Sequence, residues 1–491
     1  MWWRPQPSRA TVELLQPRWA SRFPTRLLLR VVVGLWLTLA MRLVRLSLVL
    51  TVTSAILSAC GDDGEPSGNR KLTLGETIGV NTHYGTRGQV DRQALALLRA
   101  AGVRTLRNDL DWEVVEKEPG VYDFSGSDEL VEAASAEGLR LMFILDYGNR
   151  LYGPSRAVVD DTGRTAFANF ARAAATRYRG RGVLWEVWNE PNSPFFWSGR
   201  GRGPDPSAYA QLVATTVPVV RAADPSATIF AGAVLAGIPA AFTLLGAIPH
   251  LQFLEGVFTA GVLPLIDGVT VHFYREGPPE SVSADVAAVR ALIRQHGPEK
   301  PVISGEWGYS SYDPHAPATG FNFLPAVSQD QQATYVARMI LTNFSLGLPL
   351  SVWFKDRDET NASPGNIEHH WGLLTGNLSP KPAYFALRTL SELAGEGTLS
   401  QRAPYGPGTH GLVFDTPRGQ VTALWSESPT EWRLTLLGRN SRIFDRDGRE
   451  VTPAVAAGSS LFTGPDRGPF YLLGKAVVRA QELSGQLARS R

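Results

Sequence analysis

The chain has 491 residues, a formal net charge of +2 and a hydrophobic content of 44%. This length exceeds the needs of one small domain, and the apolar content excludes a disordered chain. Residues 1–59 carry eight arginines and one glutamate, so the remainder of the chain is net acidic and predicts no nucleic-acid partner. Cys60 is the only cysteine, which excludes an internal disulfide and a cysteine-rich metal site.

The first predicted element is a secretory signal that ends at Cys60. A basic stretch, MRLVR, begins at Met41, the apolar run LSLVLTVTSAI follows, and LSAC ends at Cys60. LSAC resembles the lipobox of bacterial lipoproteins. The resemblance implies lipidation at Cys60 and a membrane-anchored protein on the extracytoplasmic face of the cell envelope, with residues 1–59 as extension and signal peptide and 60–75 as a tether. The alternative is an uncleaved membrane anchor over residues 27–59, in which the arginines would be costly.

From residue 76 onward, the pattern predicts strands that alternate with helices. Eight strands followed by helices fit a (β/α)8 TIM barrel over residues 76–395. The alternative is a doubly wound sheet, which usually has a glycine-rich phosphate loop after its first strand, and GVNTHYGTRG is not one. The predicted strands cover 77–85, 103–112, 139–148, 183–192, 228–234, 265–274, 301–308 and 349–355, and the predicted helices cover 91–102, 127–138, 166–180, 209–224, 284–297, 331–347 and 382–395.

After residue 396 the predicted strands become short, with turn residues between them. This pattern predicts a small β-sandwich over residues 396–475. Residues 476–491 are expected to form a helical or frayed tail.

Polar and aromatic residues gather at the carboxyl ends of the predicted barrel strands, where barrel enzymes carry their catalytic groups. Two carboxylates beside one cavity suit glycoside cleavage, because one protonates the leaving oxygen and the other attacks the anomeric carbon or activates water. Aromatic faces bind the apolar faces of sugar rings. No histidine and aspartate spacing typical of a metal site occurs, so we expect neither a metal nor another cofactor. The candidate residues are Arg107, Asn189, Glu190, His272, Tyr274, Glu306, Trp307 and Trp353, with Trp197 in the loop after the fourth strand.

Three motifs carry a resemblance to a known group of enzymes: WNEP at 188–191, SGEWG at 304–308, and RNDLDWEVVEKEPGVYDF at 107–124. Together they resemble glycoside hydrolase clan A, and most closely the family 39 type of exopolysaccharide-active and xylosidase-like enzymes. The resemblance implies that Glu190 is the acid/base and Glu306 the nucleophile. It also implies that Asn189 binds the sugar 2-hydroxyl and that Tyr274 and Arg107 adjoin the nucleophile. The third strand ends in LDYGN, where several clan families have a histidine.

The resemblance predicts a retaining glycoside hydrolase that cleaves a polysaccharide or oligosaccharide by double displacement. Aromatic residues in the long loops favour an open groove and endo cleavage, although such rings can also pack loops against each other. One alternative is a non-catalytic carbohydrate-binding lipoprotein, which would keep the aromatic residues and lose a carboxylate, so the presence of both carboxylates favours the enzyme. The other alternative is a transglycosylase with the same site. For Glu190 alone, the alternative is a position in the first turn of a helix capped by Asn189, which the pairing with Glu306 disfavours.

Overall fold

The computed structural model describes residues 71–199, 203–237, 240–428, 430–436, 441–451, 459–463 and 468–482. The chain divides into two units, Met1–Arg70 and Lys71–Arg491, and every described residue lies in the second. The predicted signal peptide and Cys60 therefore lie outside the described residues. Among the helices that the structure describes, none is long and apolar enough to cross a membrane.

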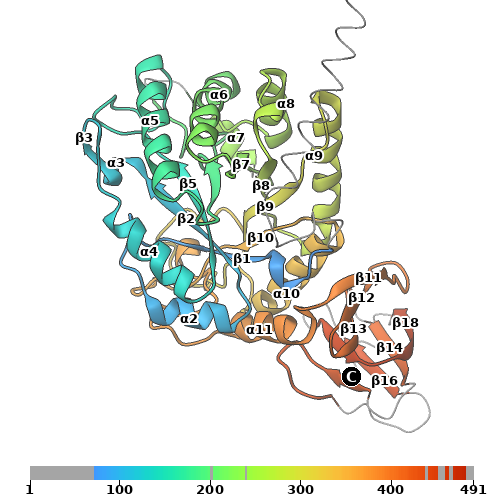
Figure 1. The fold of residues 1–491 in the computed structure, drawn as a ribbon. Helices are drawn as coiled ribbons and strands as arrows, with labels where there is room; N and C mark the ends of the chain where they lie inside the picture. The colour runs from blue at the N-terminus through green and yellow to red at the C-terminus, as the bar shows by residue number, and fades with distance from the viewer. Residues whose placement is uncertain are drawn as a thin grey trace, which may run out of the picture. The chain divides into compact units, whose positions relative to one another are not determined.

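Eight parallel strands close into a barrel, in the order β1-β10-β9-β8-β7-β6-β5-β2 (Figure 1). Each strand overlaps the range predicted from its apolar run, so the (β/α)8 prediction is confirmed. The strands of the barrel are buried along almost their whole length, as expected of parallel strands covered on both faces. The strands are β1 (Ile78–Thr82), β2 (Thr105–Asp111), β5 (Arg140–Asp146), β6 (Leu184–Val187), β7 (Thr228–Leu235), β8 (Gly268–His272), β9 (Val302–Trp307) and β10 (Ser351–Trp353).

Helices connect these strands and surround the barrel (Figure 1). Side-chain caps fix several helix starts: Asp160 accepts from the backbone of Gly163, and Ser328 accepts from the backbone of Gln331. The sequence pattern missed α8, which fills the long β7–β8 connection. The helices are α2 (Arg92–Ala100), α3 (Trp112–Val115), α4 (Ser125–Ala136), α5 (Asp161–Arg177), α6 (Pro206–Ala223), α7 (Ala240–Leu244), α8 (His250–Thr259), α9 (Val282–His296), α10 (Gln329–Ser345) and α11 (Pro382–Ala394), with short 3-10 turns at Gly75–Thr77, Leu263–Leu265, Pro279–Ser281 and Ile367–His369 and a hairpin of β3 (Glu116–Glu118) and β4 (Val121–Tyr122).

The barrel interior has an apolar layer below a polar one. The apolar layer is a buried cluster of Met142, Leu184, Phe230, Ile303, Leu350 and Val352. Glu186 follows Leu184 by two residues on β6, so its side chain faces the same interior one layer higher. It is fully buried and accepts a hydrogen bond of 2.9 Å from Arg107 Nε, as a buried carboxylate requires. The polar layer built on this pair lies at the carboxyl end of the strands.

Strand β9 contains one extra residue relative to both of its neighbours. Val271 pairs with Ser304 and His272 with Glu306, while on the other side Ser351 pairs with Ser304 and Trp353 with Trp307. The extra residue is Gly305, where an added Cβ would lie 2.1 Å from Thr270 Oγ1. A β-bulge of this kind reverses which side chains face the barrel interior beyond it.

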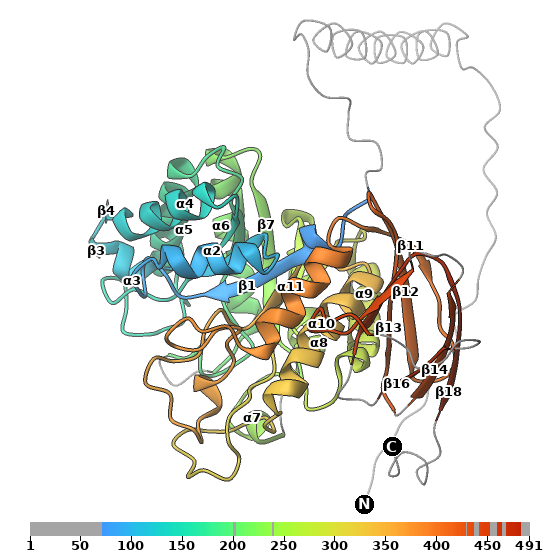
Figure 2. The same ribbon diagram turned by 90° about the horizontal axis from the view of Figure 1, so that it is seen from below.

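The C-terminal part forms two antiparallel sheets, as predicted (Figure 2). The larger contains β11 (Thr398–Arg402), β12 (Thr409–Thr416), β13 (Gly419–Ser426), β17 (Phe470–Leu473) and β15 (Arg442–Phe444). The smaller contains β16 (Ser459–Thr463), β14 (Thr430–Leu436) and β18 (Ala476–Glu482). The expectation of a helical or frayed tail is wrong for residues 476–482, because β18 pairs with β14 along seven positions.

Candidate active site

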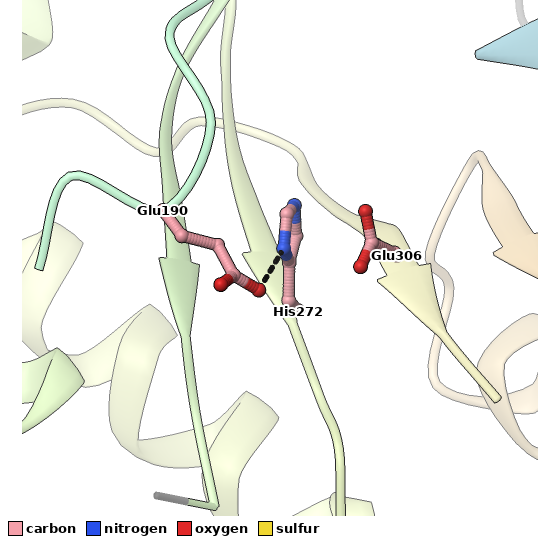
Figure 3. Close-up of side chains that lie close together, drawn as sticks. All are labelled: Glu190, His272 and Glu306. Carbon is pink, nitrogen blue, oxygen red and sulfur yellow. Dashed lines mark hydrogen bonds and ion pairs between the residues drawn. The ribbon is translucent and has the colours of Figure 1, made fainter. Parts of the chain in front are cut away.

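Six of the predicted residues meet at the carboxyl end of the barrel. One carboxylate oxygen of Glu190, one of Glu306 and a ring nitrogen of His272 all lie within 4.8 Å of one another. The two glutamates lie on either side of the imidazole (Figure 3). The bulge at Gly305 aligns Glu306 with His272 across the β8–β9 pair. The strand ends also bring Arg107, Asn189 and Tyr274 to this cluster.

Arg107 connects most of the polar groups in this layer. Its Nη1 donates to Glu306 Oε2 at 2.7 Å and to Asn81 Oδ1 at 2.9 Å. Its Nη2 donates to Asn189 Oδ1 at 2.8 Å, and its Nε binds Glu186. Burial opposes the charged form, but the charges of Glu186 and Glu306 raise the pKa of Arg107 above its ordinary value. The buried guanidinium is therefore a fixed positive charge.

Glu306 receives a donor on each carboxylate oxygen. Arg107 donates to Oε2, and the hydroxyl of Tyr274 donates to Oε1 at 2.7 Å. Burial and the charge of Glu306 raise the pKa of Tyr274 well above its ordinary value, so the phenol keeps the proton that it donates. Two charge-assisted hydrogen bonds fix the orientation of the carboxylate.

Glu190 follows β6 in an irregular backbone segment rather than in a helix. Its φ is 45° and that of Trp188 is 71°, and its backbone N–H donates to Ala233 O at 2.9 Å. The next helix, α6, begins only at Pro206, so the helix-start interpretation of Glu190 is wrong. Burial, followed by the charge of Glu306, raises the pKa of Glu190 well above its ordinary value. This carboxyl group is therefore poised to carry a proton.

His272 links Glu190 to Arg107. Its Nδ1 lies 2.9 Å from Glu190 Oε1, and its Nε2 lies 3.3 Å from Arg107 Nη2. Because a guanidinium can only donate, Nε2 accepts and the ring proton resides on Nδ1, which donates to Glu190. Burial and the charge of Arg107 lower the pKa of His272 well below its ordinary value, so the ring stays neutral. The proton of Glu190 is then on Oε2.

Glu190, His272 and Glu306 also form the group of described side chains whose ligand atoms come close enough to share one metal ion. The environment of these three side chains suits proton transfer better than metal binding. Both oxygens of Glu306 already accept hydrogen bonds, and the positive charge of Arg107 repels a cation at this place. The imidazole nitrogen that faces Glu190 carries a proton and has no lone pair to offer.

A cavity of 330 Å³ opens onto these residues, near the lower end of the range of about 300–1,000 Å³ for small-molecule sites. Its walls differ in polarity. Polar side chains of the β1 and β2 ends line one part, whereas the loops after β6, β7 and β9 supply apolar side chains to another. The polar part includes Asn81, His83, Arg87, Arg107 and Asp109, and the apolar part includes Phe195, Phe196, Leu235, Phe242, Phe321 and Phe323.

Sequence reasoning missed several of these lining residues. Asn81 and His83 lie two positions apart at the end of β1 and thus share a face, a signal that the sequence offered. Arg87 comes from the loop after β1 and Phe242 from the short helix α7, and no periodic pattern predicts the course of either segment. His83 Nδ1 lies 2.8 Å from Asp109 Oδ2, which adds a histidine–carboxylate pair to the polar wall.

Three predicted substrate-binding tryptophans do not line the cavity. Trp197, Trp307 and Trp353 are at most 1% exposed, so their assignment is corrected to packing. The bulge at Gly305 turns Glu306 inward, and Trp307 therefore faces outward. Trp353 pairs with Trp307 and shares its orientation, while the next residue, Phe354, lines the cavity. Trp197 packs on Trp188 with ring centroids 5.0 Å apart.

The loop aromatics divide between the two roles considered for them. Tyr309 and Tyr312 are buried and donate to the carbonyl groups of Gly277 and Leu324, so they hold loops together. Other aromatic side chains of the same loops reach the cavity wall, namely Phe195, Phe196, Phe321, Phe323 and Trp371.

Comparison with known proteins places the chain in a family. A family model described as cellulase, glycosyl hydrolase family 5, matches residues 62–345, which is more than half of the chain. The chain belongs to this family. The match confirms the prediction of a clan A glycoside hydrolase and places the chain among glycosidases. The predicted acid/base and nucleophile motifs both lie within the matched residues.

Individual relatives are more distant. The chain is 28% identical over 235 residues to a beta-xylosidase from Geobacillus stearothermophilus, with 43% of this chain and 42% of that protein covered. The chain thus spans less than half the length of this relative. A family 39 glycoside hydrolase from Bacteroides cellulosilyticus WH2 is similar in structure, with 24% identity, 82% of each chain covered and a TM-score of 0.66. A family 39 beta-xylosidase from Caulobacter crescentus shows 20% identity, 84% and 98% coverage and a TM-score of 0.57. The family 39 likeness is therefore one of fold.

Proposed function

We propose that this chain hydrolyses β-glycosides with retention of anomeric configuration. The observation that carries the proposal is the approach of the Glu190 and Glu306 carboxylate oxygens to within 4.8 Å. Retaining enzymes hold their two carboxyl groups about 5–5.5 Å apart, whereas inverting enzymes need about 6.5–9.5 Å to admit a water. The β configuration rests on the names of the relatives, which include a beta-xylosidase and an endo-1,4-beta-xylanase.

The two glutamates divide the chemistry. In the first step Glu306 attacks the anomeric carbon while Glu190 Oε2 protonates the departing glycosidic oxygen. In the second step Glu190, now a carboxylate, removes a proton from water as the water displaces Glu306. Arg107 and Tyr274 hold Glu306 for attack. His272 donates to Glu190 Oε1, so that only Oε2 presents a proton to the substrate.

The test is the configuration of the first product. We expect proton NMR of a hydrolysed aryl β-glycoside, recorded before mutarotation, to show the β anomer. The α anomer as the first product would refute the retaining mechanism. Aryl β-xyloside and β-glucoside are the first substrates to try. Absence of hydrolysis of every aryl glycoside would instead support the alternative of a non-catalytic carbohydrate-binding protein.

Endo cleavage of a polysaccharide is the second candidate function. It is favoured by aromatic rings that line the cavity, where Phe196 stacks near Tyr147 and Phe195 lies near Phe242. Endo cleavage would place a sugar on these rings, so it and an apolar leaving group exclude each other. β-1,4-Xylan is the first polymer to test. Early oligosaccharides with a rapid fall in viscosity would support endo action, and a monosaccharide as the sole first product would contradict it. Longer products than the substrate would indicate transglycosylation.

We also propose that the protein is lipid-anchored at Cys60, on the basis of the LSAC motif. A diacylglyceryl group supplies two acyl chains, enough for stable membrane attachment. Mass spectrometry of the mature protein is expected to find a modified Cys60 at its N-terminus. An unmodified chain that begins before Met41 would refute the proposal, and Cys60→Ser is expected to leave an unprocessed precursor.

A further inference from the structure

We infer that the leaving group of the substrate is an apolar aglycone, an aryl or alkyl alcohol, bound by the phenylalanine-lined half of the cavity. This inference rests on the proposed glycosidase function and names the substrate class of the same site. The leaving group binds in the half of the cavity that lies on the side of the proton donor.

The position of Glu190, the proposed acid/base, identifies the half of the cavity that binds the leaving group. Glu190 protonates the glycosidic oxygen, so the leaving group departs on the side of Glu190. The loop that carries Glu190 continues directly into Ser193, Phe195 and Phe196, all of which line the cavity. The sugar that Glu306 attacks lies instead beside Arg107, and this is the half with Asn81, His83 and Asp109.

The leaving-group half offers almost no hydrogen-bonding groups. Within the described parts of the strand ends and loops of β6, β7 and β9, the lining residues beyond the two glutamates are Asn189, Ser193 and six apolar side chains. The side-chain oxygen of Asn189 already accepts a hydrogen bond from Arg107. Ser193 is fully buried, and its hydroxyl accepts a hydrogen bond from the Phe195 backbone. A sugar in this position would lose hydrogen bonds to water without replacing them, which disfavours binding. An apolar aglycone has no such groups to satisfy.

The apolar half continues to the molecular surface as an aromatic rim, which we define as Phe195, Phe242, Phe321 and Phe323. Phe242 is nearly buried, and its ring centroid lies 5.3 Å from that of Phe195 and 5.5 Å from those of Phe321 and Phe323. Phe195 is 47% exposed and Phe321 is 59% exposed. Exposed aromatic groups that join a cavity mark a binding surface rather than core packing. The continuity with the catalytic cavity assigns that surface to the part of the substrate beyond the scissile bond.

The reaction remains a hydrolysis. Glu306 forms a bond to the anomeric carbon as the bond between that carbon and the alkoxy or aryloxy oxygen breaks, and Glu190 delivers its proton to that oxygen. Water then displaces Glu306 from the anomeric carbon, supplies the hydroxyl and returns a proton to Glu190. One glycoside and one water give one free sugar and one alcohol.

The experiment uses methyl, butyl and octyl β-glycosides of whichever sugar is released from its aryl glycoside. The three alcohols differ little in acidity, so differences in kcat/KM report binding of the alkyl chain. Each fully buried methylene group contributes up to about fourfold, and we expect the octyl glycoside to exceed the methyl glycoside by about tenfold or more. Phe195→Ser and Phe321→Ser are each expected to reduce this octyl-to-methyl ratio by roughly threefold or more.

Phe385→Ser is the matched control. Phe385 lies on α11, is 36% exposed and does not line the catalytic cavity, so the ratio is expected to stay at the wild-type value. An equal kcat/KM for the three alkyl glycosides, or ratios unaffected by both rim substitutions, would overturn the inference. So would a disaccharide of the same sugar that is cleaved more efficiently than the octyl glycoside. Failure to cleave any aryl glycoside would refute the glycosidase proposal itself and is thus a separate outcome.

Discussion

Tyr274→Phe isolates one hydrogen bond to the proposed nucleophile. The substitution removes the hydroxyl that donates to Glu306 Oε1 at 2.7 Å and keeps the ring, whose centroid lies 5.6 Å from that of Trp371. A hydrogen bond to a charged group contributes about 1.5–3 kcal/mol. If the bond acts by holding Glu306 for attack, its loss is expected to lower kcat/KM about 10- to 150-fold.

The assay is hydrolysis of an aryl β-glycoside, with thermal unfolding measured in parallel. Tyr309→Phe is a suitable control, because it removes a buried hydroxyl that donates to Gly277 O at 2.9 Å outside the catalytic cavity. We expect the control to keep its activity even if its stability falls. A decrease of less than about twofold for Tyr274→Phe would refute the reasoning, and so would an equal decrease in the control.

Glu190→Ala is expected to lower kcat/KM about 10²- to 10⁴-fold on alkyl glycosides and far less on activated aryl glycosides. Azide is expected to restore turnover as a glycosyl azide, and no effect of azide would contradict the acid/base role. Because Glu190 must be protonated in the first step, activity is expected to fall as pH rises through its raised pKa. NMR of Glu306→Gln is expected to show a lower pKa for Glu190, since one cause of the shift is gone, and an unchanged value would contradict this. Burial and the charge of Asp109 raise the pKa of Asp146 well above its ordinary value, so its contribution to stability is present below about pH 4 and is lost as pH rises through the raised pKa. Asp146→Asn is therefore expected to lose less stability between pH 5 and pH 8 in urea unfolding, and identical pH dependence in both proteins would contradict it.

The barrel and the two glutamates could be predicted because their signals are local. Each buried parallel strand appears as an apolar run, and catalytic groups follow those runs at a known edge of the fold. Glu186 follows the inward-facing Leu184 by two residues on β6, so it also faces the interior, and Arg107 provides the partner that a buried carboxylate requires.

The remaining errors come from features with no local signal. Trp307 was assigned to the substrate because the bulge in β9 cannot be read from composition. Residues 476–482 carry helix-forming alanine and glutamine, but pairing with β14 outweighs that propensity. Phe242 reaches the cavity from α7, whose position depends on a loop of irregular course.

The extra residue in β9 determines which side chains of this strand face the proposed active site. Ile303 faces the interior, so strict alternation would direct Gly305 and Trp307 inward and leave the proposed nucleophile against the surrounding helices. Removal of Gly305 would remove the bulge and place Glu306 at the inward position that Gly305 now occupies, about 3.3 Å lower in the barrel, where an added Cβ would lie beside Thr270 and Glu186. An insertion or deletion of a single codon in this strand therefore matters more to the chemistry than most substitutions around it. In a homologue, this feature can be checked by counting the residues between the inward-facing residue equivalent to Ile303 and the residue equivalent to Glu306.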